Sequence, residues 1–141
     1  MALDVDQLET SFDLLAPRGE ELVQLFYRRL FETAPQVQPL FANTDMKRQR
    51  AMLLAAVVLL RNSLRDLDAL VPKLHAMGAR HAGYGVSAEL YPIVGQALLA
   101  SMAELAGDAW HPDLADAWSD AYGVVASAML DGADAAQRLA A

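Results

Sequence analysis

Apolar residues recur at helical spacing along almost the whole chain, and no stretch alternates apolar and polar residues as a half-buried strand does. Residues that favour helices, chiefly Ala, Leu, Glu, Gln and Arg, dominate the composition. Proline, glycine and asparagine interrupt the periodicity at 17, 35–39, 43–45, 83–85 and 107–112. The pattern therefore predicts an all-α protein, and the length of 141 residues suits a single domain over residues 1–141.

The first half of the chain is expected to hold three helices. Asp4 and Gln7 stand three apart, as in a capping box, and begin the first. The second covers about 19–34 and is followed by a turn over 35–41. The third, which contains a ten-residue apolar run at 51–60, is expected over about 46–65.

The second half is also expected to hold three helices. Asp68 is the predicted cap of a short helix that carries Pro72 in its first turn and His81 near its end. Ser87 is the predicted cap of the next helix. Pro112 stands where the first residue of the last helix is expected.

Composition narrows the class of protein. The residues are 55% hydrophobic and 21% charged, as in globular proteins. The longest apolar run is half of the about 20 residues that a membrane span needs, and the N-terminus has no basic and apolar leader. We expect a cytoplasmic protein without membrane contact. The net charge of −7, with one small basic cluster at 47–50, argues against nucleic acid as a partner.

The chain contains no cysteine. This absence excludes disulfides, iron–sulfur clusters, cysteine nucleophiles and thiolate-bound or thioether-linked haem. Any haem must be held by packing and by a different ligand.

Three histidines, His75, His81 and His111, are the remaining candidates for metal chemistry. They form no zinc motif, and the chain has no glycine-rich phosphate loop. His81 lies at the end of a helix, just before a Gly-x-Gly break, where a lone histidine is more often a capping residue than a ligand. We interpret His75 as a surface residue and His111 as part of a helix start.

A series of short segments changes this interpretation of His81. In order along the chain they are Leu25-Phe26-Tyr27-Arg28-Arg29-Leu30-Phe31, Pro39-Leu40-Phe41, Gln49 with Leu53, His81, Tyr91-Pro92-Ile93-Val94-Gly95-Gln96, Ala117-Trp118 and Ala121-Tyr122-Gly123. Their order and spacing resemble the globin domain of flavohaemoglobins and of their single-domain relatives, over nearly the whole chain. The resemblance implies a globin fold and a non-covalent haem b whose iron is bound by His81.

The resemblance also implies that two residues lie on the open face of the iron, where gases bind. A phenol from Tyr27 and an amide from Gln49 can donate hydrogen bonds to a ligand that gains negative charge. From the residues alone, Tyr27 would be a core aromatic and Gln49 a solvated helix residue. Arg50 stands where several relatives have proline, which makes the start of this helix more regular.

On the side of His81, the resemblance implies that Tyr91 supports the ligating histidine. The glutamate that completes this arrangement in the family is replaced by Ala133. Apolar residues at matching positions are expected to line the haem site, although ordinary core packing would also explain them. These residues are Phe41, Leu53, Val57, Val86, Val94 and Met129.

The resemblance implies reversible binding of dioxygen, used for nitric oxide dioxygenation or oxygen transport. The sequence shows no flavin or nicotinamide domain after the globin, so we expect a separate reductase as partner. One alternative is a haem-based gas or redox sensor that acts through a partner protein. Another is a haem-free helical interaction domain or a bilin carrier, although bilin carriers attach their pigment through cysteine. An absorption spectrum would separate these classes.

Overall fold

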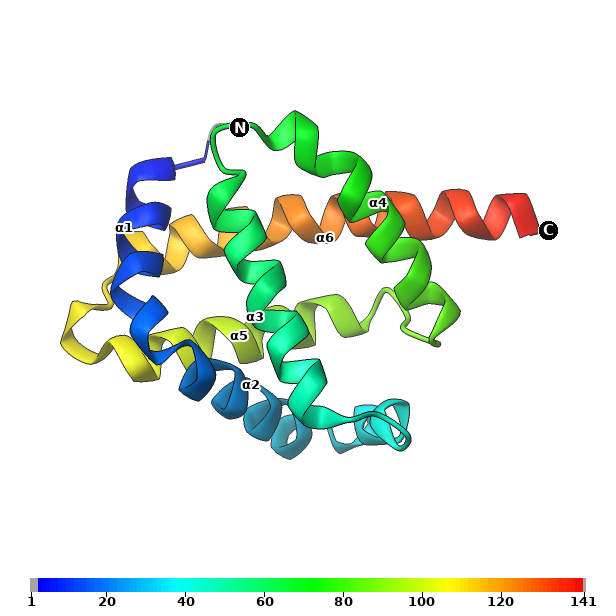
Figure 1. The fold of residues 1–141 in the computed structure, drawn as a ribbon, viewed down its shortest axis with the longest axis horizontal. Helices are drawn as coiled ribbons and strands as arrows, with labels where there is room; N and C mark the ends of the chain where they lie inside the picture. The colour runs from blue at the N-terminus through cyan, green and yellow to red at the C-terminus, as the bar shows by residue number, and fades with distance from the viewer. Residues whose placement is uncertain (1–2, 141) are drawn as a thin grey trace.

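The computed structural model describes residues 3–140 and contains six α-helices joined by short turns and 3₁₀ segments within that range (Figure 1). No strand occurs among the described residues, which confirms the all-α prediction. The elements in order are α1 (Val5–Leu15), η1 (Ala16–Arg18), α2 (Gly19–Thr33), η2 (Pro35–Phe41), α3 (Met46–Asn62), α4 (Leu67–Gly83), α5 (Leu90–Ala106), η3 (Gly107–Ala109) and α6 (Pro112–Ala140).

Local chemistry explains why several helices begin where they do. The Asp4 carboxylate accepts a hydrogen bond of 3.3 Å from the Gln7 backbone N–H, as the capping-box pattern predicts. At the start of α3, the Asp45 carboxylate accepts from the backbone N–H groups of Lys47 and Arg48 at 3.1 and 3.4 Å. Pro112 opens α6, as expected, because the first helical position needs no N–H.

Two predicted caps are wrong. Helix α4 begins at Leu67, so Asp68 lies inside its first turn, where a carboxylate favours the positive end of the helix. Helix α5 begins at Leu90 with no side-chain cap, and the backbone carbonyl of Ser87 accepts a hydrogen bond of 3.1 Å from the Leu90 N–H. In both places the backbone turn, rather than a polar side chain, determines the first helical residue.

Two helix lengths also differ from the prediction. Helix α3 ends at Asn62 instead of 65, because the Ser63 N–H bonds to the Leu60 carbonyl at 3.0 Å and tightens the last turn. Helix α4 is 17 residues long rather than short, and Pro72 lies in its interior instead of its first turn. Proline removes one backbone donor there, and the helix continues past it.

The helices surround an apolar interior in crossed layers (Figure 1). The long helix α6 runs across the back of the view, and α4 crosses it and packs along it. Helix α2 packs against α5 at the lower side. Helix α3 crosses the front of the molecule and contacts α2 and α1. The apolar stripes predicted for the first, second and last helices are buried at Leu8, Phe12, Leu15, Leu22, Leu25, Phe26, Leu30, Leu114, Trp118, Ala121, Ala128 and Met129.

Two glycines allow α4 and α6 to touch backbone to backbone. A Cβ atom on Gly78 would overlap the carbonyl oxygen of Met129, and one on Gly132 would overlap the carbonyl oxygen of His75. No other residue type can occupy either position without moving a helix. The crossing therefore determines where α4, and with it His81, lies.

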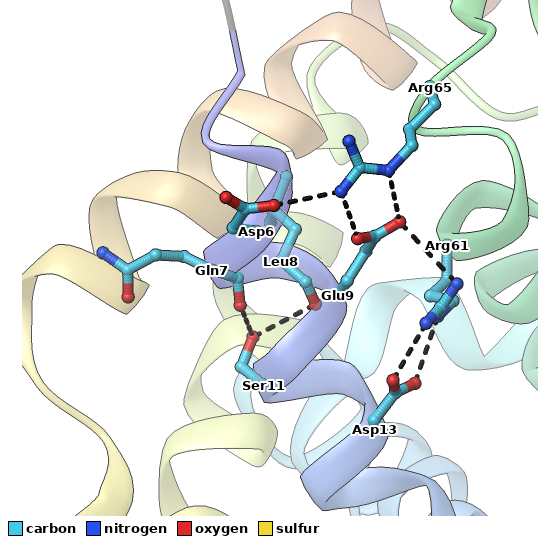
Figure 2. A network of polar contacts seen from close by, with 8 residues as sticks. All are labelled: Asp6, Gln7, Leu8, Glu9, Ser11, Asp13, Arg61 and Arg65. Atoms are coloured by element: carbon cyan, nitrogen blue, oxygen red, sulfur yellow. Dashed lines mark hydrogen bonds and ion pairs between the residues drawn. The ribbon is translucent and has the colours of Figure 1, made fainter.

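Ion pairs join α1 to the end of α3 and the turn after it (Figure 2). The Arg65 guanidinium donates to Glu9 at 2.7 Å and to Asp6 at 3.0 Å. Arg61 donates to Asp13 at 2.9 and 3.1 Å. These charged contacts hold α1 against the helix that leads into α4.

Within residues 3–140, none of the helices combines the length and the apolar character that crossing a membrane requires.

Candidate functional site

The buried core is divided into two apolar clusters. The larger lies among α1, α2, α3, α5 and α6 and includes Tyr27, Val57 and Trp118. The smaller lies between α4, α6 and the start of α5 and includes Leu74, Tyr91 and Met129. Leu60 of α3 packs on both clusters.

The predicted site residues fall on both sides of that division. Phe41, Leu53, Val57 and Val94 belong to or pack on the larger cluster, and Val86, Tyr91 and Met129 belong to or pack on the smaller one. Helices α3 and α4, which carry Leu53 and His81, do not pack along each other in the described part of the chain.

Helix α3 is strongly apolar, yet Val57 is its only buried residue in the described structure, and Met52 is 57% exposed. Isolated apolar surface costs free energy when it faces water. An apolar prosthetic group packed on α3 would remove such surface from water, so these residues fit a haem.

His81 is half-buried near the end of α4, and its ring is held by the backbone. Its Nδ1 lies 2.7 Å from the Met77 carbonyl oxygen, one turn earlier in α4. A carbonyl can only accept, so Nδ1 carries the proton and Nε2 keeps its lone pair. The Val86 N–H also donates to the His81 carbonyl at 3.0 Å. This histidine is thus prepared to bind a metal through Nε2.

Tyr91 is buried in the smaller cluster, and its support of His81 stays a prediction. Its backbone carbonyl accepts a hydrogen bond of 2.6 Å from the Tyr122 hydroxyl of α6. Burial raises the pKa of both phenols, and the nearby Tyr91 raises that of Tyr122 further.

Tyr122 is a residue that the sequence analysis assigned no role. A Cβ on Gly95 would lie 2.6 Å from the Tyr122 ring, so the glycine makes room for the tyrosine. The sequence signal was a glycine four residues after Tyr91, on the same face of α5. Tyr122 therefore ties α6 to the first turn of α5, directly where Tyr91 enters the site.

Tyr27, which belongs to the larger cluster, and Gln49 come together. The Gln49 side-chain amide donates to the Tyr27 hydroxyl oxygen at 3.0 Å, across 22 positions of sequence. Tyr27 is 6% exposed, and burial raises its pKa, whereas the Gln49 hydrogen bond and the Arg50 charge act in the lowering direction. The phenol stays neutral and keeps its O–H to donate.

Aromatic rings hold Tyr27 in place. Its ring meets Phe26 at 4.8 Å and Phe41 at 5.7 Å between centroids, both edge to face, and Phe31 lies 6.0 Å away. Edge-to-face packing of this kind orients a ring as well as burying it. The Tyr27 hydroxyl is therefore fixed in direction before any ligand arrives.

The other two histidines lie away from this site. His75 is exposed, as expected for a surface residue, and His111, also exposed, immediately precedes α6, as expected for a helix start. Tyr84, which follows α4, was not singled out by the sequence analysis. It is 65% exposed, and its ring centroid lies 6.0 Å from that of His81.

Comparisons with known proteins identify relatives of this chain. The family model described as Globin matches residues 24–129. The chain is 33% identical to a flavohemoprotein of Bacillus subtilis over 128 residues, which cover 89% of this chain and 32% of the relative. It is 35% identical to a flavohemoprotein of Chromobacterium violaceum over 125 residues, with 87% and 31% covered. The chain spans about a third of the length of these curated relatives.

Solved structures agree with the arrangement of the helices. A bacterial globin from Campylobacter jejuni superposes with a TM-score of 0.81 at 26% identity, over 92% of this chain and 94% of the other. A proposed nitric oxide dioxygenase from Rhodothermus marinus, engineered into a carbene transferase, gives a TM-score of 0.85 at 27% identity, over 97% and 96%.

Proposed function

Because the chain belongs to the globin family, we propose that it holds a non-covalent haem b between the two apolar clusters, with Nε2 of His81 as the iron ligand. The observation that carries this proposal is the hydrogen bond between Nδ1 of His81 and the Met77 carbonyl. This bond selects the tautomer whose Nε2 can bind iron, and it makes that nitrogen more basic, as partners of metal ligands generally do.

The apolar residues on both sides of the site hold the group and exclude water. Leu53 and Val57 contribute from α3, Val94 from α5 and Met129 from α6. Dry surroundings strengthen the electrostatic effect of every polar group that remains. Two such groups, Tyr27 and Gln49, lie on the side opposite His81 in this proposal.

A bound haem would supply an iron centre that takes up dioxygen and nitric oxide. The Tyr27 hydroxyl accepts from the Gln49 amide, and its own proton is free to be donated into the site. A phenol O–H stabilises a ligand that has gained negative charge, and contributes more to such a ligand than to a neutral one. Tyr27 thus favours dioxygen over ligands of low polarity.

The reaction that fits these residues best is nitric oxide dioxygenation, in which dioxygen and nitric oxide give nitrate. The flavohemoprotein relatives and the Rhodothermus neighbour support this proposal. Each turnover would leave oxidised haem, so a reductase must return one electron. We propose a separate protein as that donor.

The absorption spectrum of the purified protein, supplemented with haem, tests the cofactor. We expect a Soret band and two visible bands after reduction in air. In His81→Ala the haem should be lost or become dependent on added imidazole, whereas His75→Ala, on the same helix but exposed, should keep it. Absence of a Soret band, or haem loss only in His75→Ala, would overturn the proposal.

A further inference from the structure

The positive charge of this acidic protein is concentrated on the two helices that flank the site. Residues 46–83 contain seven of the eleven Lys and Arg and two of the eighteen Asp and Glu, a net charge of +5. The rest of the chain carries −12. Such an uneven distribution creates a local field opposite in sign to the net charge.

Part of this positive charge has no partner within the protein. Arg61 and Arg65 are engaged by acids of α1. Lys47, Arg48 and Arg80 are exposed and take part in no ion pair among the described residues. Lys47 and Arg48 immediately precede Gln49 of the site, and Arg80 immediately precedes His81.

Exposed apolar side chains lie close in sequence to these charged residues. Tyr84 is 65% exposed, and its backbone N–H bonds to the Arg80 carbonyl at 3.1 Å. Leu40 is 38% exposed. Its side chain would be in van der Waals contact with a Cβ atom on Gly85, the residue after Tyr84. The end of η2 and the turn after α4 therefore adjoin, and each carries an exposed apolar side chain.

We propose that this surface, made by Leu40, Lys47, Arg48, Arg80 and Tyr84 and here called the basic rim, is the docking site of an acidic protein that donates single electrons. The inference rests on the proposed haem function and adds the chemistry of its partner. An apolar centre surrounded by charges is the usual anatomy of a protein interface, and opposite charges speed the encounter.

The geometry provides a short path for the electron. The Tyr84 ring lies at the surface with its centroid 6.0 Å from that of His81, the proposed iron ligand. One electron passes from the partner to ferric iron, which becomes ferrous, and the partner is oxidised by one electron. No bond is made or broken in this step.

The test is anaerobic stopped-flow reduction of the ferric holoprotein by the hydroquinone of flavodoxin, a small acidic protein. Lys47→Glu/Arg48→Glu reverses the charge of the rim, and negative residues in the first turn of α3 suit the helix dipole, so the fold should persist. Arg28→Glu/Arg138→Glu is the matched control, because it makes the same change of net charge at two exposed residues of α2 and α6.

We expect the rim variant to be reduced about tenfold more slowly than the unmutated protein at low salt, and the control less than twofold. The difference should disappear at 1 M salt, where the screening length is about 3 Å. Reduction by the small cation hexaammineruthenium(II) should be faster in the rim variant. Equal rates in both double variants, or no change in either, would overturn the inference.

Three further outcomes would overturn the docking inference. If the unmutated protein sediments with phosphatidylglycerol vesicles and the rim variant does not, while both are reduced by flavodoxin at the same rate, the rim binds a membrane and the inference is wrong. If no Soret band forms in any variant, the proposed haem function fails and the docking inference fails with it. A Soret band with rates indifferent to the rim charges would reject the docking inference alone.

Discussion

The Tyr27 hydroxyl is the most sharply positioned polar group of the site. Its oxygen accepts from Gln49 at 3.0 Å, its ring is held by three phenylalanines, and its side chain is almost fully buried. A buried donor without a protein acceptor is costly, which is a reason to expect a ligand there. The contribution of the Tyr27 hydroxyl can therefore be tested by removing its oxygen atom.

Tyr27→Phe is expected to speed the release of dioxygen. A hydrogen bond to a charged acceptor contributes about 1.5–3 kcal/mol, which corresponds to roughly a ten- to hundredfold faster dissociation. Carbon monoxide, which gains little charge, should be affected less. Stopped-flow dissociation of dioxygen measures the effect, with the exposed Tyr84→Phe as control. An unchanged rate in Tyr27→Phe would remove this role.

Ala133→Glu is expected to strengthen the donation from His81 to the iron. Ala133 is buried, and its side chain offers no acceptor to the His81 ring, whose N–H is bonded to a neutral carbonyl. A carboxylate in its place would make the ring more basic. Resonance Raman of the deoxy ferrous form should show a higher iron–histidine stretching frequency, and titration a lower reduction potential. An imidazolate-like stretch in the unmutated protein would show that another acid already acts there.

At the scale of elements, the crossing of α4 and α6 determines where the histidine helix lies. The two helices touch at Gly78 and Gly132, where the lack of a side chain lets the two backbones pack in direct contact. His81 follows Gly78 by three residues, within one helical turn. A change at this crossing is therefore transmitted directly to the iron ligand.

Gly78→Ala is expected to destabilise the protein, although alanine is the better helix former by about 1 kcal/mol. The added methyl meets the Met129 carbonyl, and forced repacking of this kind costs about 1–3 kcal/mol. Gly123→Ala is the control on α6, where nothing lies within 4 Å, and it should be neutral or stabilising. Urea unfolding measures both, and the rate of haem loss should rise only in Gly78→Ala. Equal stability of the two variants would contradict the close crossing.

At the scale of the whole molecule, charged pairs close the bundle where α1 meets the end of α3 (Figure 2). Hydrogen bonds from Arg65 and Arg61 hold the pKa of Glu9 and of Asp13 below their ordinary values of 4.5 and 3.8. A carboxyl whose pKa is lowered by folding stabilises the fold above its unfolded value, and this stabilisation is lost as the pH falls through the lowered pKa.

Acidification from pH 5 to pH 3 is therefore expected to remove these contacts and lower the melting temperature. Arg61→Gln/Arg65→Gln should melt lower than the unmutated protein at pH 7 and lose less on acidification, because its carboxyls are no longer paired. High salt should reduce the difference at pH 7, since Asp6, Asp13 and Arg65 are exposed and Glu9 and Arg61 are partly exposed to solvent. Calorimetry at several pH values measures it, with Arg28→Gln/Arg138→Gln as control. Parallel pH curves for the two double variants would exclude the network as the cause.

The sequence by itself determined the helices and most of their buried faces, because periodicity and capping act over a few residues. Asp4, Asp45 and Pro112 mark helix starts through contacts with their nearest neighbours. The order of motifs around Tyr27 and His81 also sufficed to predict the globin family, which the matched region confirms.

The tertiary structure alone decided how the site is supported, because its contacts join residues far apart in sequence. The Tyr122 hydroxyl reaches the Tyr91 carbonyl across 31 positions, and α4 meets α6 through Gly78. Spacing along the chain identifies candidates for such contacts, but only the packed helices determine which of them form.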